Sequence, residues 1–128
     1  MVSLEREDAA PGPIITGFAG GGFCVDGDVY AHGLWLTPES ARGWDAPAFG
    51  DLTAAALDEL LSTAPLPEFL LLGTGAALNR PSPEFIAAIE TRDIGVEVMD
   101  SRAAARSWGI LRAEERWIVA ALMPLNDS

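Results

Sequence analysis

Short apolar runs separated by glycine and aspartate fill the first third of the chain, a pattern typical of antiparallel β-structure. Asp26-Gly27-Asp28 stands between two of these runs. Asp-Gly in that position favours a two-residue hairpin turn, because both central positions of the turn need positive φ. The glycines between residues 17 and 22 could form a ligand loop, but a bulged hairpin explains them more simply. We expect strands at residues 14–18, 23–25, 29–31 and 33–37.

The second half of the chain reads as strand, helix, strand, helix and strand. Leu70-Leu71-Leu72 belongs to an unbroken apolar run, which a strand needs when both of its faces are buried in a parallel sheet. Ser82-Pro83-Glu84 is typical of a helix start, with a capping hydroxyl, a proline whose missing N–H costs nothing, and an acid near the positive end of the helix dipole. Strands that alternate with helices imply parallel, right-handed crossovers. We expect a helix at about 53–62, strands at 69–72, 95–99 and 117–123, and helices capped by Ser82 and by Asp100-Ser101.

The chain has the size and apolar content of one folded domain, with 128 residues of which 49% are hydrophobic. We expect a flexible acidic arm at residues 1–13 and a single α/β domain at residues 14–128. No apolar run approaches the roughly 20 residues that span a bilayer. The acidic start of the chain is the opposite of a signal peptide. The sequence therefore predicts a cytoplasmic protein without direct membrane insertion.

The net charge is −11, with 19 acidic residues and 8 basic residues, all of them arginine. A total this negative repels nucleic acid and anionic lipid beyond contact range. The one candidate basic patch is interspersed with acidic residues in the sequence, and consists of Arg92, Arg102, Arg106, Arg112 and Arg116. We therefore expect no nucleic-acid partner, and an acidic surface that suits solubility or a basic protein partner.

One cysteine and one histidine restrict the chemistry of the chain. Cys24 cannot form an internal disulfide, and with His32 alone it cannot complete the usual zinc site. Ser-His-Asp or Cys-His catalysis would rest on His32. We expect both residues to be structural, and no bound metal or cofactor. Most of the four tryptophans should lie in the core, and an exposed one would indicate a protein-binding face.

Non-routine residues follow two of the expected strands, Gly73-Thr74-Gly75 after 69–72 and Asp100-Ser101 after 95–99. Open parallel sheets bind ligands beyond the carboxyl ends of their strands, so these loops would line one crevice if the strands pair. Backbone N–H groups at the glycines and the helix start at Ser101 would suit an anion. The candidate ligand-binding residues are Gly73, Thr74, Gly75, Arg80, Asp100 and Ser101.

A structural role explains the same loops. Gly73-Thr74-Gly75 matches only the first part of a dinucleotide-binding motif, since Leu78 stands where the third Gly or Ala belongs. The following helix begins late, after Ser82, and Asp100 would repel a phosphate. Tight turns use the same glycines, so the loop also fits a sharp exit from a buried strand.

Four segments together resemble one known family. They are Ile15 to Phe23 (I-T-G-F-A-G-G-G-F), Gly33-Leu34 leading to Trp44, Leu70 to Gly75 (L-L-L-G-T-G), and Gly95 to Asp100 (G-V-E-V-M-D). The family consists of small α/β proteins called a domain of unknown function, and it includes the mitochondrial respiratory complex I assembly factor 3. The resemblance covers about residues 13–123.

The resemblance implies an α/β fold in three layers, with an N-terminal β-hairpin layer packed on a central, mostly parallel sheet of about four strands with helices. The family's activity is not established as enzymatic. Its mitochondrial members are similar to assembly chaperones that work near the inner membrane. Its bacterial members often lie beside genes of the protein-export machinery, which implies a role in membrane-protein biogenesis.

The chain departs from the family pattern after Asp100. The family usually has a cysteine where this chain has Ala105, which argues against thiol chemistry at this position, and an asparagine where it has Gly109. Asparagine and glycine both tolerate the left-handed conformation that ends a helix. We therefore expect the last helix to break at Gly109.

Three functional hypotheses remain open. The first is a non-enzymatic assembly or biogenesis factor that holds a protein partner, in one version as a homodimer, with an exposed apolar patch on the β-hairpin layer or near an outward tryptophan. The second is a small-ligand or nucleotide-binding module at the carboxyl edge of the parallel sheet. The third, an enzyme, would need Asp100 as acid or base beside His32 or Thr74, and nothing in the sequence places these residues together.

Overall fold

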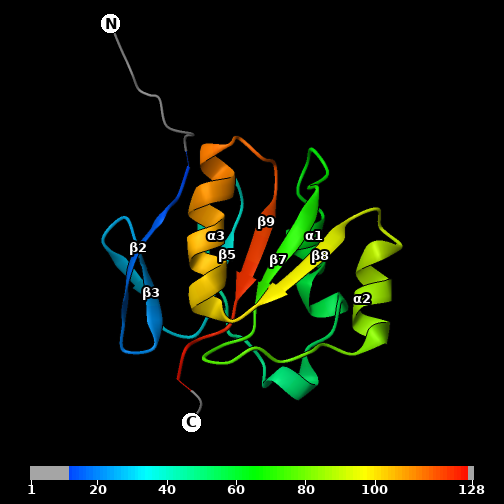
Figure 1. Cartoon of the computed structure of the whole chain (residues 1–128), viewed down its shortest axis with the longest axis horizontal. Coiled ribbons are helices and arrows are strands. Elements are labelled where there is room, and N and C mark those ends of the chain that lie inside the picture. Colours follow the sequence, from blue (N-terminus) through cyan, green and yellow to red (C-terminus); the bar gives the residue numbers. More distant parts are fainter. Residues whose placement is uncertain (1–11, 127–128) are drawn as a thin grey trace, which may run out of the picture.

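The structure, a computed structural model, describes residues 12–126. Within these residues the fold contains two β-sheets and three α-helices (Figure 1). The smaller sheet is antiparallel and contains β2 (Ile15–Ala19), β3 (Gly22–Val25) and β4 (Asp28–Tyr30). The larger sheet is mixed and contains, in spatial order, β6 (Ala41–Gly43), β5 (Leu34–Leu36), β9 (Val119–Leu122), β7 (Phe69–Gly73) and β8 (Gly95–Met99). The fold is therefore α/β, as expected.

The small sheet confirms the predicted hairpins. Asp26 and Gly27 connect β3 to β4 with φ values of 52° and 88°, the positive pair that the two-residue turn requires. A bulge lies in β2, where the register shifts between Ile15 and Gly17. The expected acidic arm at residues 1–13 falls outside the described residues except for its last two. Of these, Pro13 is buried, and its carbonyl accepts a hydrogen bond from Trp108 Nε1 at 2.9 Å.

The large sheet is less parallel than expected and has five strands, not four. β9, β7 and β8 are mutually parallel, whereas β5 and β6 pair antiparallel. The expected strand at 33–37 joins this sheet next to β9 and turns back at once through Thr37 to Ser40. The sequence of β6, Ala-Arg-Gly, has no apolar run, so its pairing depends on the backbone of β5.

Both faces of the large sheet are covered, as the apolar run in β7 predicts. Leu71 belongs to the core between the sheet, α3 (Ser101–Ala113) and the small sheet, where Trp108 is fully buried. Leu70 and Leu72 belong to the opposite core, which α1 (Asp58–Leu61) and α2 (Pro83–Glu90) cover. Neighbouring residues of one strand thus contribute to two separate cores.

The helices confirm the predicted caps. Ser82 Oγ accepts a hydrogen bond from Phe85 N at 3.1 Å, and Asp100 Oδ1 accepts one from Ala103 N at 2.9 Å. The helix expected at 53–62 is shorter: two 3-10 turns, at Phe49–Asp51 and Ala55–Leu57, precede the single α-helical turn of α1. No helix in the described part of the chain combines the length and the apolar content needed to traverse a bilayer.

The expected helix break at Gly109 is wrong. α3 continues through Gly109 to Ala113, and the chain turns only at Glu115, which has a φ of 61°. The residues after Gly109 explain the continuation, because Arg112 is buried and Leu111 packs against the core. The cost of one glycine inside a helix, about 1 kcal/mol, is small compared with the loss of that burial.

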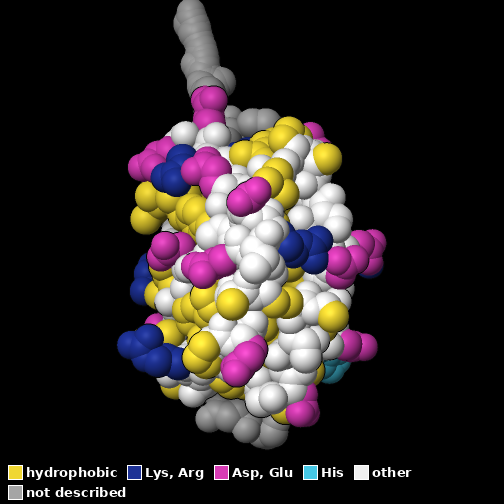
Figure 2. Space-filling view, turned by 90° about the vertical axis from the view of Figure 1, so that its right-hand side faces the viewer, with side chains coloured by type: hydrophobic (Ala, Val, Ile, Leu, Met, Phe, Trp, Pro, Cys, Tyr) yellow, Lys and Arg dark blue, Asp and Glu magenta, His cyan; other side chains and the backbone are white. Residues whose placement is uncertain are grey.

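On the side of the molecule where α2 and β8 lie, hydrophobic side chains are exposed in small groups between charged ones (Figure 2). None of the four tryptophans is among the exposed large hydrophobic residues of the described chain. These are Ile14, Phe18, Val29, Leu66, Leu78 and Ile110.

Candidate functional site

The loops after β7 and β8 lie side by side, as expected for paired parallel strands. Gly73 is opposite Met99 in the register, and Thr74 N donates a hydrogen bond to Met99 O at 2.9 Å. The sheet therefore brings Gly73-Thr74-Gly75 together with Asp100-Ser101 at one edge.

Ser101 connects three chain segments at this edge. Its fully buried hydroxyl accepts a hydrogen bond from Gly75 N at 2.8 Å and donates one to Met123 O at 2.7 Å. Its own N–H donates to Gly75 O at 2.8 Å. The N–H of Gly75, which an anion would have used, is thereby bonded inside the protein.

Thr74 organises the loop that follows. Its hydroxyl donates to Ala77 O at 2.7 Å and accepts from Asn79 N at 3.0 Å, so the chain curves around the side chain. Gly73 allows the close approach of α3, because a Cβ at this position would lie 2.7 Å from both Ser101 Oγ and Leu122 Cδ2. Gly75 has a φ of 101°, where side chains are strained. The motif thus has a structural explanation at each of its three residues.

The side chains of the two remaining candidates, Asp100 and Arg80, make no hydrogen bond to this loop in the described part of the chain. The Asp100 carboxylate caps α3 through the N–H of Ala103, as described above. Arg80 is exposed in the connection between Asn79 and α2. The N–H groups of Thr74 and Gly75 and the carboxylate of Asp100 all have protein partners.

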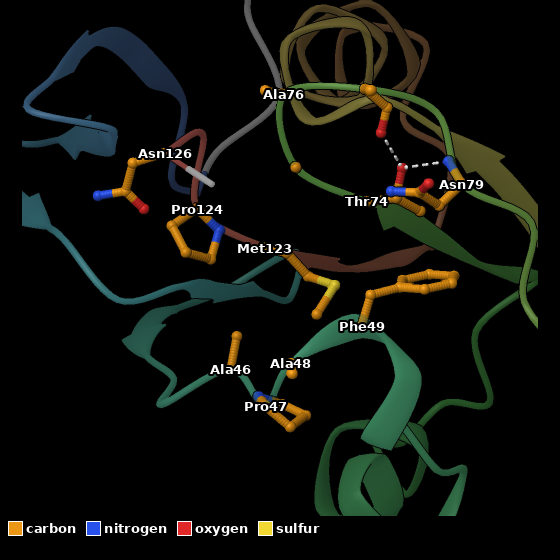
Figure 3. A pocket seen from close by; sticks show the side chains of 12 residues that line it. Ala46, Pro47, Ala48, Phe49, Thr74, Ala76, Asn79, Met123, Pro124 and Asn126 are labelled. Carbon is orange, nitrogen blue, oxygen red and sulfur yellow. Dashed lines mark hydrogen bonds between the residues drawn. The ribbon is translucent and has the colours of Figure 1, made fainter. Parts of the chain in front are cut away.

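A hollow of about 530 Å³ does lie next to the loop, on its β9 side (Figure 3). Three segments of the chain border it: the stretch before the first 3-10 turn, the loop after β7, and the chain after β9. Its lining residues are Ala46, Pro47, Ala48, Phe49, Thr74, Gly75, Ala76, Ala77, Asn79, Met123, Pro124 and Asn126. Thr74 and Gly75 are thus the two candidate residues that reach the hollow.

The position of the hollow follows from the strand order. The chain leaves β7 toward α2 on one face of the sheet, and α3 packs on the other face before β9 returns beside β7. Crevices in α/β sheets form where neighbouring strands connect to opposite sides. The sequence predicts a crevice at the loops after β7 and β8, whereas this hollow lies on the β9 side of β7 and is also bordered by residues 46–49 and Asn126. The strand order, which decides this, has no local sequence signal.

The lining is mostly apolar, with two amide side chains. Phe49 and Met123 lie on one side and Asn126 lies on the opposite side, while Asn79 belongs to the loop after β7 (Figure 3). Among residues 12–126, no acidic, basic, histidine or cysteine residue borders the hollow. Such a lining suits an uncharged group and provides no acid, base or nucleophile beyond the Thr74 hydroxyl, which is already hydrogen-bonded.

The carboxyl groups whose pKa departs from its ordinary value lie away from the hollow, in two surface ion pairs. A hydrogen bond from Arg42 lowers the pKa of Glu59, and a hydrogen bond from Arg116 lowers the pKa of Glu68. Across residues 12–126, no cluster of three or more His, Cys, Asp or Glu side chains is arranged to hold a metal ion. Titratable chemistry therefore does not point to the hollow.

Comparisons with known proteins place the whole domain in one group. The NADH dehydrogenase [ubiquinone] 1 alpha subcomplex assembly factor 3 of Danio rerio is 29% identical over 123 residues, which are 96% of this chain and 71% of that protein. An uncharacterised protein of Rhodobacter capsulatus is 31% identical over 121 residues, 94% of this chain and 92% of that protein. The crystal structure of a Bordetella parapertussis protein superposes with a TM-score of 0.80 at 33% identity, covering 93% of this chain and 99% of that one.

A family model agrees with these relatives and with the resemblance noted in the sequence. The model describes a protein of unknown function, DUF498/DUF598, and it matches residues 15–123, from β2 to the end of β9. The match includes both sheets and all three α-helices. The chain therefore belongs to the DUF498/DUF598 family of proteins of unknown function.

Proposed function

We propose that this protein is a non-enzymatic assembly or biogenesis factor that acts by holding a protein partner. The observation that carries the proposal is the similarity to assembly factor 3 proteins along 96% of the chain. A relative that matches over both sheets supports a common fold, and its printed role as an assembly factor is the reason for proposing an interaction role here.

The site geometry supports an interaction role over a catalytic one. Asp100 and Thr74, two residues that an enzymatic mechanism would need, are hydrogen-bonded to the backbone. Exposed apolar side chains are present on the small sheet, at Phe18 and Val29, where we expect the partner-binding patch. We further propose that the partner belongs to the machinery of respiratory-complex or membrane-protein assembly, and that the protein acts in the cytoplasm.

A homodimer remains part of the proposal, with β8 as its contact. β8 is an edge strand of the large sheet and has five residues with neither proline nor lysine to block pairing. Sedimentation analysis of the full chain over a range of concentrations tests this point. A single monomeric species at all concentrations would remove the homodimer and leave the assembly role intact.

Affinity purification tests the main proposal. The full chain, tagged at its natural expression level, is cross-linked in cells and purified, and the attached proteins are identified. We expect subunits or assembly factors of a membrane-bound complex, enriched over an equally expressed, unrelated acidic domain. Recovery of no specific protein in repeated experiments would contradict the assembly role.

A second candidate function is favoured by the hollow between β7 and β9. Its volume of about 530 Å³ is in the range of small-molecule sites, and its amide side chains would orient a small ligand. The test is a thermal shift of the full chain with nucleotides, other phosphorylated metabolites and uncharged compounds. A stabilisation that is lost in Asn79→Ala, and not in the distant variant Val29→Thr, would support this function. No stabilisation by any compound would contradict it.

A further inference from the structure

The five arginines between residues 92 and 116 do not form one patch. Arg92 donates to Asp58 Oδ1 at 2.9 Å, and Arg116 forms an ion pair with Glu68 at 2.7 Å. Arg112 is buried, and its Nη1 donates to Arg116 O at 2.6 Å. Arg102 and Arg106 differ from these three, because both are exposed and neither has an ion pair in the described part of the chain.

Arg102 and Arg106 belong to a stripe on the outer face of α3. Residues four apart lie above one another on a helix, so Ile110 continues the stripe by one more turn. Ile110 is 62% exposed, the largest value among the exposed large hydrophobic residues. α3 contains three arginines and no acidic residue, in a chain with a net charge of −11. Its outer face is therefore basic and apolar on an otherwise acidic protein.

The small sheet borders the first turn of this stripe. The ring of Phe18 lies 5.8 Å from Arg102 Cζ, within the range of a cation–π contact. Phe18 is itself 42% exposed. The contact holds the Arg102 guanidinium against an apolar surface and leaves its charge available to a partner.

A groove with five apolar lining residues, and with Glu97, Ser107 and Arg116 as its polar ones, borders the last turns of the stripe. It has a volume of about 390 Å³ and lies between α3 and the β7–β8 part of the sheet. No further strand of the described residues covers it, because β8 is the edge of the large sheet among residues 12–126. Figure 2 views the molecule from the β8 side and shows hydrophobic side chains exposed between charged ones. The groove is lined by Phe69, Leu71, Glu97, Met99, Ser107, Ile110, Leu111 and Arg116.

From this arrangement we propose that the outer face of α3 binds an acidic amphipathic helix of a partner protein. The inference rests on the proposed interaction function and names its surface. Arg102 and Arg106 are about 6 Å apart along the helix axis, which matches two carboxylates one turn apart on a facing helix. A large apolar side chain of the same helix enters the groove beside Ile110. The complex combines charge complementarity, which orients the helix, with apolar burial, which supplies affinity.

Nucleic acid and anionic membranes fit this surface less well. Both would meet the net charge of −11 on the rest of the protein, which repels them at a distance. Neither would fill the groove beside Ile110 with aliphatic side chains at helical spacing. A protein helix with few charges outside its contact stripe meets little of this repulsion, and it can place an aliphatic side chain in the groove.

The test uses two synthetic peptides of about 18 residues, long enough to form a helix in water. Both carry leucine at the same positions of one face, and the flanking positions are glutamate in one peptide and lysine in the other. Each is titrated into the full, nitrogen-15-labelled chain, and binding is followed by amide chemical shifts and by fluorescence anisotropy. We expect the glutamate peptide to bind and to shift the amides of α3 and β8.

Two variants localise the binding. Arg102→Gln with Arg106→Gln should weaken the glutamate peptide by about tenfold or more, as for the loss of charge-assisted hydrogen bonds. Ile110→Gln should weaken the binding of the glutamate peptide, because it replaces an apolar side chain of the groove with a polar one. The matched control is Arg42→Gln with Arg92→Gln, which removes the same charge from side chains bonded to Glu59 and Asp58. The control should leave the affinity within about twofold.

Three results would overturn the α3 surface: no binding of the glutamate peptide, equal binding of the lysine peptide, or an equal loss in the control variant. Affinity purification with the Arg102→Gln, Arg106→Gln chain separates this inference from the proposed function. Unchanged capture of the partner by that variant would overturn the α3 surface and leave the assembly role in place. Failure of the unaltered chain to capture any partner would contradict the assembly role instead.

Discussion

Ser101 Oγ accepts a hydrogen bond from Gly75 N at 2.8 Å, across 26 positions of sequence. The bond joins the start of α3 to the loop after β7. The same oxygen donates to Met123 O, so one buried hydroxyl fixes the carboxyl ends of two parallel strands relative to a helix. The Gly73-Thr74-Gly75 loop, which borders the hollow, is thereby fixed to the start of α3 and to the chain after β9.

Replacing Ser101 by alanine should destabilise the protein by about 2–3 kcal/mol, because Gly75 N and Met123 O would both be buried without a partner. Urea unfolding measures the effect. Ser107→Ala, in the same helix, is the control, because the hydrogen bond that the structure describes for its hydroxyl goes to Met99 Sδ in β8, at 3.3 Å. We expect the control to lose less than about 1 kcal/mol. Equal losses in the two variants would contradict the special role of Ser101.

Gly73→Ala should destabilise the protein by about 1–3 kcal/mol through overpacking. The added methyl group would lie 2.7 Å from Leu122 Cδ2 and 2.9 Å from the backbone Cα of Ser101, and the backbone cannot rotate away. The measurement is again the free energy of unfolding in urea. Gly50→Ala serves as control, because a Cβ at Gly50 meets no atom within 4 Å. A Gly73→Ala chain as stable as that control would show that α3 is not in close contact with β7.

The ion pair between Glu68 and Arg116 should add stability above the ordinary pKa of glutamate, about 4.3. The hydrogen bond from Arg116 lowers the pKa of Glu68 in the folded protein. A lowered folded pKa means that the stabilisation is present above the unfolded value and is lost as the pH falls through the folded value. The difference in unfolding free energy between the natural chain and Glu68→Gln should therefore shrink as the pH falls below about 4.3 and through the lowered pKa of Glu68.

High salt provides the control for this ion pair. Both side chains are partly exposed, so salt should reduce the difference between Glu68→Gln and the natural chain at pH 7. A difference that does not change with pH or with salt would show that Glu68 acts by packing and not by charge.

Features set by neighbouring residues in the chain could be predicted from the sequence. The Asp26-Gly27 turn, the Ser82 and Asp100 caps and the doubly buried run around Leu71 each depend on a few consecutive residues, and the structure confirms them. The resemblance to the family also extends over the expected residues, since the family model matches 15–123.

Features set by contacts distant in sequence could not be predicted. β6 has no apolar pattern and exists because β5 offers a free edge, and the position of β9 beside β7 places the hollow away from Asp100. The loop at Ala46 to Phe49, which borders the hollow, has no motif. The sequence predicts a helix start at Ser101, but the hydrogen bonds of Ser101 to Gly75 and Met123 follow from strand order, which no local pattern indicates.

The last prediction concerns Gly109, where the sequence predicts a helix break and the structure has continuous helix. Gly109 lies inside α3, and a Cβ at this position meets no atom within 4 Å. Gly109→Ala should therefore stabilise the protein by about 0.5–1 kcal/mol, through the higher helix propensity of alanine. Thermal and urea unfolding measure the gain.

The control for this change is Gly20→Ala, which has equal room for a methyl group but a φ of 57°. Left-handed backbone costs a residue with a Cβ about 1 kcal/mol, so the control should lose stability where Gly109→Ala gains it. Opposite signs would show that the backbone conformation, and not a lack of room for a methyl group, requires glycine at position 20. If Gly109→Ala also loses stability, the helix does not continue through this residue, and the basic stripe from Arg102 to Ile110 would lose its straight alignment.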